Sequence, residues 1–121
     1  MRRLYGEISM QTNKPAVHIY VADDTLPAIR EICAGMEEEG VPWKILRMDG
    51  AARGLAHRAA TDSVLEAGIG LAAGEVALQM RKVAEDCPLF IFTAPTAEQY
   101  RMIGTNAARA VKKKRFRMAE L

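Results

Sequence analysis

The fold is decided by the stretch AVHIYVADDTLPAIREICAGMEEEGVPWKILRM, residues 16–48. Its opening run, 16–22, is apolar and rich in β-branched side chains, which predicts a strand. An Asp-Asp-Thr sequence with Pro27 follows, and this combination is typical of a helix start. Residues 43–48 predict a second strand. A strand, a helix and a second strand in this order indicate two strands that lie parallel in one sheet.

The helix between these strands has a single apolar side. Its apolar residues recur at helical spacing, at Ile29, Ile32, Cys33 and Met36. Gly40 supplies the left-handed residue that often follows a helix, and Pro42 prevents its continuation. Three consecutive glutamates, 37–39, therefore occupy the last turn. The partial negative charge of a helix C-terminus disfavours each of them by up to about 1 kcal/mol.

The rest of the chain predicts a short alanine-rich helix, three strands and a last helix, at 54–63, 66–72, 74–82, 88–94 and 96–113. Helices that alternate with strands imply a largely parallel sheet covered on both faces. The tight step between the third and fourth strands allows a local antiparallel pair. We expect one three-layer α/β/α domain over 15–121, with a mixed, mostly parallel five-stranded sheet. Residues 1–14 are expected to be a flexible leader.

The composition excludes several classes of protein. Half of the residues are hydrophobic but only 6% are aromatic, so the core is expected to be aliphatic and rich in alanine. The net charge of +2 is too small to indicate a nucleic-acid partner. No apolar run is long enough to span a membrane. Cys33 and Cys87 match neither a disulfide framework nor a zinc site, which favours two structural thiols in a reducing cytoplasm.

No stretch of the sequence carries a recognised catalytic pattern. The glycine-rich residues 68–75, GIGLAAGE, lack the order of a phosphate-binding loop and join two predicted strands, so no helix N-terminus is available for an anion. A tight strand connection is the favoured interpretation. A general base needs a nucleophile or an orienting carboxylate within reach, and neither His18 nor His57 is part of a local Ser-His or Cys-His signature, so neither is assigned a catalytic role.

Two charged stretches have alternative interpretations. The basic run VKKKRFR, 111–117, is expected to be solvated and to complement a helix C-terminus, or else to contact an acidic partner protein. Without interleaved aromatics it is a weak candidate for nucleic-acid binding. Asp23 and Asp24 follow the first strand, where a flavodoxin-like domain would place ligand-binding groups. Helix capping is the simpler role for this pair.

The helical wheel separates the three glutamates. On a wheel that starts at Ile29 and turns about 100° per residue, Glu37 falls at about 80° and Glu39 at about 280°, on either side of the apolar stripe. They are expected to be ordinary solvated charges. Glu38 falls at about 180°, opposite Ile29. It is therefore expected to point away from the core, either into solvent or toward a cation or basic partner. Mg²⁺ suits one carboxylate with further ligands from elsewhere, so a metal site here would require a second chain.

Four stretches together resemble the small (β) subunit of the diol/glycerol dehydratase-reactivating factor. They are GMEEEGVPW (35–43), SVLEAGIGLAAGEVAL (63–78), CPLF (87–90) and RMIGTNAARAVK (101–112), the last followed by FR. They occur in the family's order and spacing over roughly 16–117. The leader and the basic residues 112–115 depart from the family pattern.

The resemblance implies an α/β fold like that of the dehydratase β subunit, an architecture similar to that of anticodon-binding domains. It implies a non-catalytic subunit that pairs with an ATPase large subunit of the actin-type heat-shock chaperone fold, in an α₂β₂ complex. That complex releases damaged cobalamin from an inactivated adenosylcobalamin-dependent diol or glycerol dehydratase. ATP and ADP would bind to the large subunit, and this chain would hold no cofactor alone.

By the same resemblance, Glu38 would reach a Mg²⁺ ion at the interface with the large subunit, with Glu37 and Glu39 also at that interface. A cytoplasmic location follows, and association with a bacterial microcompartment is left open. Neither a membrane nor a nucleic acid is expected as a partner. Two other functions stay open from the residues alone: a stand-alone small-molecule-binding domain with a flavodoxin-like fold, and an RNA-binding module.

Overall fold

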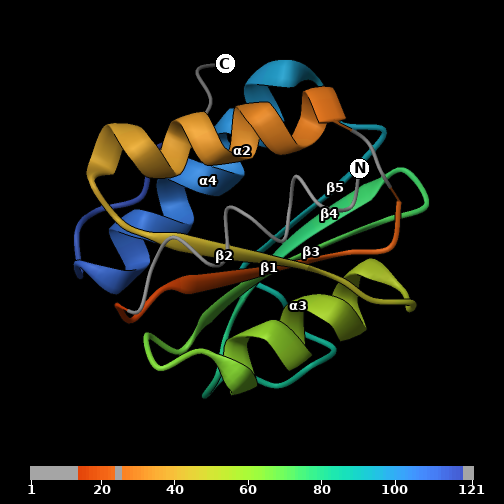
Figure 1. The fold of residues 1–121 in the computed structure, drawn as a ribbon, viewed down its shortest axis with the longest axis horizontal. Helices are drawn as coiled ribbons and strands as arrows, with labels where there is room; N and C mark the ends of the chain where they lie inside the picture. Colours follow the sequence, from red (N-terminus) through yellow and green to blue (C-terminus); the bar gives the residue numbers. More distant parts are fainter. Residues whose placement is uncertain (1–13, 24–25, 119–121) are drawn as a thin grey trace.

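The computed structural model describes residues 14–23 and 26–118 (Figure 1). The elements are β1 (Val17–Val21), α2 (Leu26–Glu39), β2 (Trp43–Arg47), α3 (Ala52–Asp62), β3 (Ala67–Ala72), β4 (Glu75–Met80), β5 (Phe90–Thr93) and α4 (Ala97–Val111). The predicted order of strands and helices is confirmed. The predicted leader lies outside the described residues except for Lys14.

The strands form one mixed sheet in the order β2-β1-β3-β4-β5. Strand β1 is parallel to β2 and β3, whereas β4 is antiparallel to both β3 and β5. Every strand except β4 therefore points the same way. Helices α2 and α4 cover one face and α3 covers the other, so the predicted three-layer α/β/α domain with a mostly parallel sheet is confirmed (Figure 1).

Alternation along β1 divides the core into two parts. Val17, Ile19 and Val21 are fully buried against the α2 and α4 layer. Tyr20 faces the opposite side and packs with the small residues of α3. The aliphatic core expected from the composition is therefore split by the sheet, as the period of two along a strand requires.

Glycines on β3 explain why α3 is rich in alanine. A Cβ atom at Gly68 would lie 2.6 Å from the carbonyl oxygen of Ala56, and one at Gly70 would lie 2.5 Å from the backbone nitrogen of the same residue. The helix thus rests directly on the strand backbone. The glycine-rich stretch at 68–75 is therefore needed for helix packing as well as for the strand connection.

The connection between β3 and β4 is a two-residue turn, as predicted. Ala73 and Gly74 adopt positive φ angles of 50° and 75°, which matches the twist of a tight hairpin. Asp23 accepts a hydrogen bond from the backbone nitrogen of Ala73 at 2.9 Å. Its carboxylate therefore holds this turn, and Asp24 lies outside the described residues.

Helices α2 and α4 cross at two glycines. A Cβ atom at Gly35 would lie 2.6 Å from the backbone nitrogen of Thr105, and one at Gly104 would collide with the carbonyl oxygen of Ile32. Any side chain at these positions would push the helices apart. The two backbones can be this close only because both positions lack a Cβ.

We predict that Gly104→Ala lowers the free energy of unfolding by about 1–3 kcal/mol, the usual cost of overpacking a close contact. Alanine raises intrinsic helix propensity by about 1 kcal/mol, so a loss of stability would have to come from the crossing. Urea denaturation of the purified chain measures the effect.

The matched control is Gly54→Ala in α3, where the new Cβ would meet its nearest neighbour at 3.6 Å, an ordinary contact. This variant should be as stable as the parent or slightly more stable. Equal stability of Gly104→Ala and the parent would contradict the close crossing.

Candidate functional site

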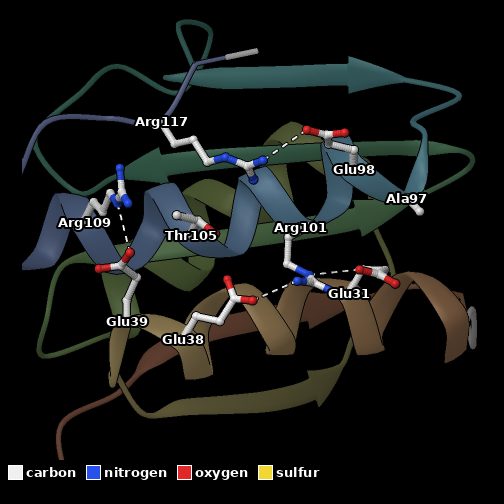
Figure 2. A pocket seen from close by; sticks show the side chains of 9 residues that line it. All are labelled: Glu31, Glu38, Glu39, Ala97, Glu98, Arg101, Thr105, Arg109 and Arg117. Carbon is white, nitrogen blue, oxygen red and sulfur yellow. Dashed lines mark hydrogen bonds and ion pairs between the residues drawn. The ribbon is translucent and has the colours of Figure 1, made fainter. Parts of the chain in front are cut away.

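The candidate site is an open groove of about 470 Å³ along helices α2 and α4 (Figure 2). Its lining is charged except for two residues, and consists of Glu31, Glu38, Glu39, Ala97, Glu98, Arg101, Thr105, Arg109 and Arg117. The acids come mainly from α2 and the arginines from α4 and the segment after it. Because the helices cross at glycines, these opposite charges are within reach of one another.

Arg101 joins two of the acids. Its Nε donates to Glu31 Oε1 at 3.0 Å, and its Nη1 donates to Glu38 Oε2 at 2.9 Å. The Glu38 side chain is 59% exposed, so one of its oxygens is paired while the carboxylate is still accessible. Glu38 is exposed, as expected, but it does not project straight out from the domain, because it points into the groove toward α4 (Figure 2).

Glu39 lies at the centre of a separate cation cluster. Arg109 Nε contacts one carboxylate oxygen at 3.0 Å, and the ammonium groups of Lys112 and Lys114 contact the other at 3.3 Å and 3.4 Å. The Glu39 side chain is only 11% exposed. The hydrogen bond from Arg109, with those from the two lysines, lowers the pKa of the Glu39 carboxyl from 4.5 to about 2, although its burial acts in the opposite direction.

The prediction that Glu39 is an ordinary solvated charge is therefore wrong. The wheel treated the helix as an isolated cylinder, and it placed Glu39 beside the apolar stripe without showing that α4 lies against that side. Glu37 is exposed, as expected, and no ion pair of Glu37 occurs among the described residues. A signal was present in the sequence: arginines and lysines recur along the last helix at the spacing of one face.

The basic run after α4 is also engaged within the chain. Helix α4 ends at Val111, and Lys113 turns the backbone with a φ angle of 60°. Lys112 and Lys114 then bind Glu39, and Arg117 Nη2 contacts Glu98 Oε2 at 3.0 Å. Lys112 and Lys114 are exposed, as expected for a solvated run, but together with Arg117 they also pair with acids of the same domain.

A buried asparagine holds this segment in place. Asn106 Oδ1 accepts from the backbone nitrogen of Arg117 at 2.6 Å, and Asn106 Nδ2 donates to the Arg117 carbonyl at 2.8 Å. Phe116 packs edge-on against Phe90 of β5, with ring centroids 5.3 Å apart. The segment 112–118, which we call the C-terminal strap, thus folds back beside α4 and supplies one wall of the groove.

A second polar cluster lies on the α3 side of the sheet. The hydroxyl of Tyr20 donates to Asp62 Oδ2 at 2.6 Å and lies 3.2 Å from His18 Nδ1. Burial, then the hydrogen bond to Asp62, raises the pKa of Tyr20. Burial, followed by the charge of Lys44, lowers the pKa of His18. No nucleophile other than this protonated tyrosine is part of the cluster, so it supports no hydrolytic triad.

His57 lies half-buried on α3, and its Nδ1 is buried without a hydrogen-bond partner. Cys33 and Cys87 are both free thiols, as expected from their spacing. Burial and the charge of Glu37 raise the pKa of the Cys33 thiol to about 12. A thiol that stays protonated is a poor nucleophile, so Cys33 has a packing role.

Within 14–23 and 26–118 no cluster of three or more His, Cys, Asp or Glu residues could hold a metal ion. The chain therefore has in these segments no complete metal site. Glu38 can still provide a single carboxylate ligand, because only its Oε2 is engaged by Arg101. No helix in the same segments has the length and apolar character needed to cross a membrane.

Comparison with known proteins gives a consistent result. The family model described as the dehydratase medium subunit matches residues 14–117. A probable glycerol dehydratase-reactivating factor small subunit from Citrobacter freundii is 34% identical over 109 residues, which covers 85% of this chain and 93% of the relative. The diol dehydratase-reactivating factor small subunit from Klebsiella michiganensis is 32% identical over 105 residues, covering 85% of this chain and 84% of the relative.

Two solved structures share the fold. A chain of a glycerol dehydratase reactivase superposes with a TM-score of 0.82 at 35% identity, over 87% of this chain and 98% of that one. A chain of a diol dehydratase-reactivating factor complexed with ADP and Mg²⁺ gives a TM-score of 0.81 at 31% identity, over 88% of this chain and 100% of the other.

The lowered pKa of Glu39 predicts a pH dependence of stability. Because the carboxyl is more acidic in the folded chain, its stabilising contribution is complete above about pH 4.5 and is lost as the pH falls toward 2. The difference in unfolding free energy between the parent and Glu39→Gln should therefore be constant from neutral pH to about pH 5 and shrink below it. Urea denaturation at several pH values measures this difference, with Glu37→Gln as the control. A difference that grows on acidification would contradict the assignment.

We also predict that Asn106→Ala releases the C-terminal strap. The substitution removes both hydrogen bonds to the Arg117 backbone, at a cost of about 1–3 kcal/mol. Trypsin should then cleave within 112–117 faster than in the parent, as followed by mass spectrometry. Glu98→Gln removes only an exposed ion pair and should leave the cleavage rate nearly unchanged. Equal cleavage rates for Asn106→Ala and the parent would show that the asparagine does not hold the strap.

Proposed function

The chain belongs to the dehydratase medium subunit family and, within it, to the small subunits of glycerol and diol dehydratase-reactivating factors, and we propose that it acts as the non-catalytic partner of an ATPase large subunit. In this role it helps to release damaged cobalamin from an inactivated adenosylcobalamin-dependent dehydratase. ATP and ADP are bound by the large subunit, in an α₂β₂ complex. The client is a diol or glycerol dehydratase.

The observation that carries this proposal is the match to relatives named as small subunits over nearly their whole length. A small subunit implies a larger one, and one similar structure was solved with ADP and Mg²⁺. The described residues of this chain combine no nucleophile with a base and an orienting group. These features support a protein that acts through binding rather than through its own chemistry.

The charged groove is the surface we propose for the large subunit. Interfaces that form and separate are more polar than permanent ones, whose centres are mostly apolar. The groove has paired acids and bases along its length and little apolar lining. Such a surface stays hydrated in the free subunit, which suits a subunit that exchanges partners.

We propose that Glu38 contributes one ligand to a Mg²⁺ ion shared with the large subunit. The fit rests on its exposed carboxylate, on the free oxygen beside the one bound by Arg101, and on the two neighbouring acids. Mg²⁺ prefers oxygen ligands and is often held by one or two carboxylates with waters. The ion would supply a bridge between acidic groups of the two chains. Glu37 and Glu39 lie beside it: Glu37 is free to contact the partner, whereas Glu39 is held within this chain.

The two other functions gain no support from the structure. Asp23, the described member of the pair considered for a small-molecule site, holds the turn between β3 and β4. Three residues of the basic run considered for RNA binding are paired with Glu39 or Glu98, namely Lys112, Lys114 and Arg117. A cytoplasmic location follows from the proposed role, and any association with a bacterial microcompartment is open.

We predict that Glu38→Gln weakens Mg²⁺-dependent assembly with the large subunit by about 1–3 kcal/mol, the scale for a charged group that loses its partner. Each 1.4 kcal/mol corresponds to about a tenfold change in Kd. The measurement is binding of the full chain to the co-purified ATPase large subunit, with and without Mg²⁺. Glu37→Gln is the matched comparison, since its carboxylate occupies the same helix end but does not line the groove, and it should weaken Mg²⁺-dependent assembly less than Glu38→Gln does.

The two parts of the proposal can fail separately. Absence of any complex in Mg²⁺ buffer would refute the partnership with the large subunit. A stable complex that responds neither to Mg²⁺ nor to Glu38→Gln would refute the metal role alone. Glu39→Gln is not a control here, because this residue stabilises the domain itself.

A further inference from the structure

We propose that Arg101 is a positioning residue, which fixes the Glu38 carboxylate in the orientation that binds the cation shared with the partner. The inference rests on the proposed function of Glu38 and adds a residue and a mechanism to it. Its basis is the contact between one guanidinium and two acids of another helix (Figure 2).

The geometry of α2 places both acids on one line. Glu31 and Glu38 are seven residues apart, close to two full turns, so they share one face of the helix about 10 Å apart along its axis. Arg101 reaches between them from α4, with its Nε on Glu31 and its Nη1 on Glu38. A planar guanidinium that donates in two directions restricts both carboxylates.

The backbone of Arg101 is itself fixed. Its carbonyl oxygen lies directly against Gly35, where an added Cβ would collide with it. Arg101 therefore starts from one of the two close contacts of the helix crossing, and its side chain is only 34% exposed. A guanidinium anchored at the backbone and at Glu31 can hold Glu38, which sits near the end of its helix.

Only one oxygen of Glu38 is used in this contact. Arg101 binds Oε2 at 2.9 Å, and the other oxygen points into the groove (Figure 2). Carboxylates that bind a metal commonly accept a hydrogen bond that orients them, and loss of that bond typically lowers metal affinity about 10–100-fold. The arrangement in the free chain thus matches a carboxylate prepared for one cation.

The charges also favour a cation at this place. Arg101 alone would repel a metal ion, but Glu31 compensates its charge. The three groups together carry a net charge of −1, from two carboxylates and one guanidinium. Glu31 therefore allows the orienting contact to form without removing the attraction for a cation.

The test is a Mg²⁺ titration of assembly between the full chain and the large subunit. The quantity measured is the Mg²⁺ concentration at half-maximal complex formation. Arg101→Gln should raise it about 10–100-fold. Arg101→Lys, which keeps the charge but loses the two-directional contact, should raise it less. Glu31→Gln should raise it as well, because Arg101 then carries uncompensated charge beside the cation.

Two comparisons separate positioning from a general loss of stability. Arg58→Gln removes an arginine from an ion pair on α3, on the opposite face of the sheet, and should leave the Mg²⁺ midpoint unchanged. Urea denaturation of Arg101→Lys and Arg101→Gln shows whether each variant is folded under the assay conditions, since a folding defect would lower assembly at every Mg²⁺ concentration rather than shift the midpoint. Arg101→Lys keeps the test decisive if Arg101→Gln does not fold.

The outcomes are distinct. A raised Mg²⁺ midpoint for both Arg101 variants, with an unchanged midpoint for Arg58→Gln, supports the inference. An unchanged or lowered midpoint for the Arg101 variants, while Glu38→Gln raises it, overturns the positioning role and leaves the proposed function standing. If Glu38→Gln does not change the midpoint either, the metal role and the positioning role both fail.

Discussion

The close crossing of α2 and α4 at Gly35 and Gly104 is the constraint on which the rest of this structure depends. Without side chains at these points, the backbone of one helix touches that of the other. The crossing buries Ile32 and Ile103 over the sheet. It also brings the acidic side of α2 within hydrogen-bonding distance of the arginines of α4. Packing of small residues and pairing of charges are therefore two results of one geometry.

Electrostatics at the end of α2 follow from that geometry. Three acids at a helix C-terminus oppose the helix dipole, but Arg101 and the cluster around Glu39 offset the repulsion with opposite charge from α4 and the strap. The two contacts have different consequences. Glu39 is surrounded by cations and ties the strap to the domain, whereas Glu38 keeps an accessible oxygen. One acid of the triplet thus serves stability and its neighbour is available for a partner.

This division fits the proposed role of the chain in assembly with a larger subunit. The described residues place no catalytic constellation in a cavity, and the groove along α2 and α4 is lined mainly by paired charges. Recognition through such a surface depends on orientation more than on apolar area. The strap contributes to the same surface, because Asn106 holds Arg117 at the groove wall. Folding of the C-terminal segment and formation of the candidate interface are therefore linked.

The order of the elements, the mixed sheet, a tight connection between the third and fourth strands and the helix end at Gly40 were all predictable from the sequence. These depend on local periodicity and on residues with restricted or unusual backbone angles, which a linear sequence displays. The role of Glu38 as the member of the triplet that binds a cation stays a prediction. The partners of the charges could be read only from the fold, because Glu38 and Arg101 are separated by 63 residues and Glu39 and Arg109 by 70. Such contacts depend on which faces of the two helices cross. The glycines permit this close crossing because they have no side chain.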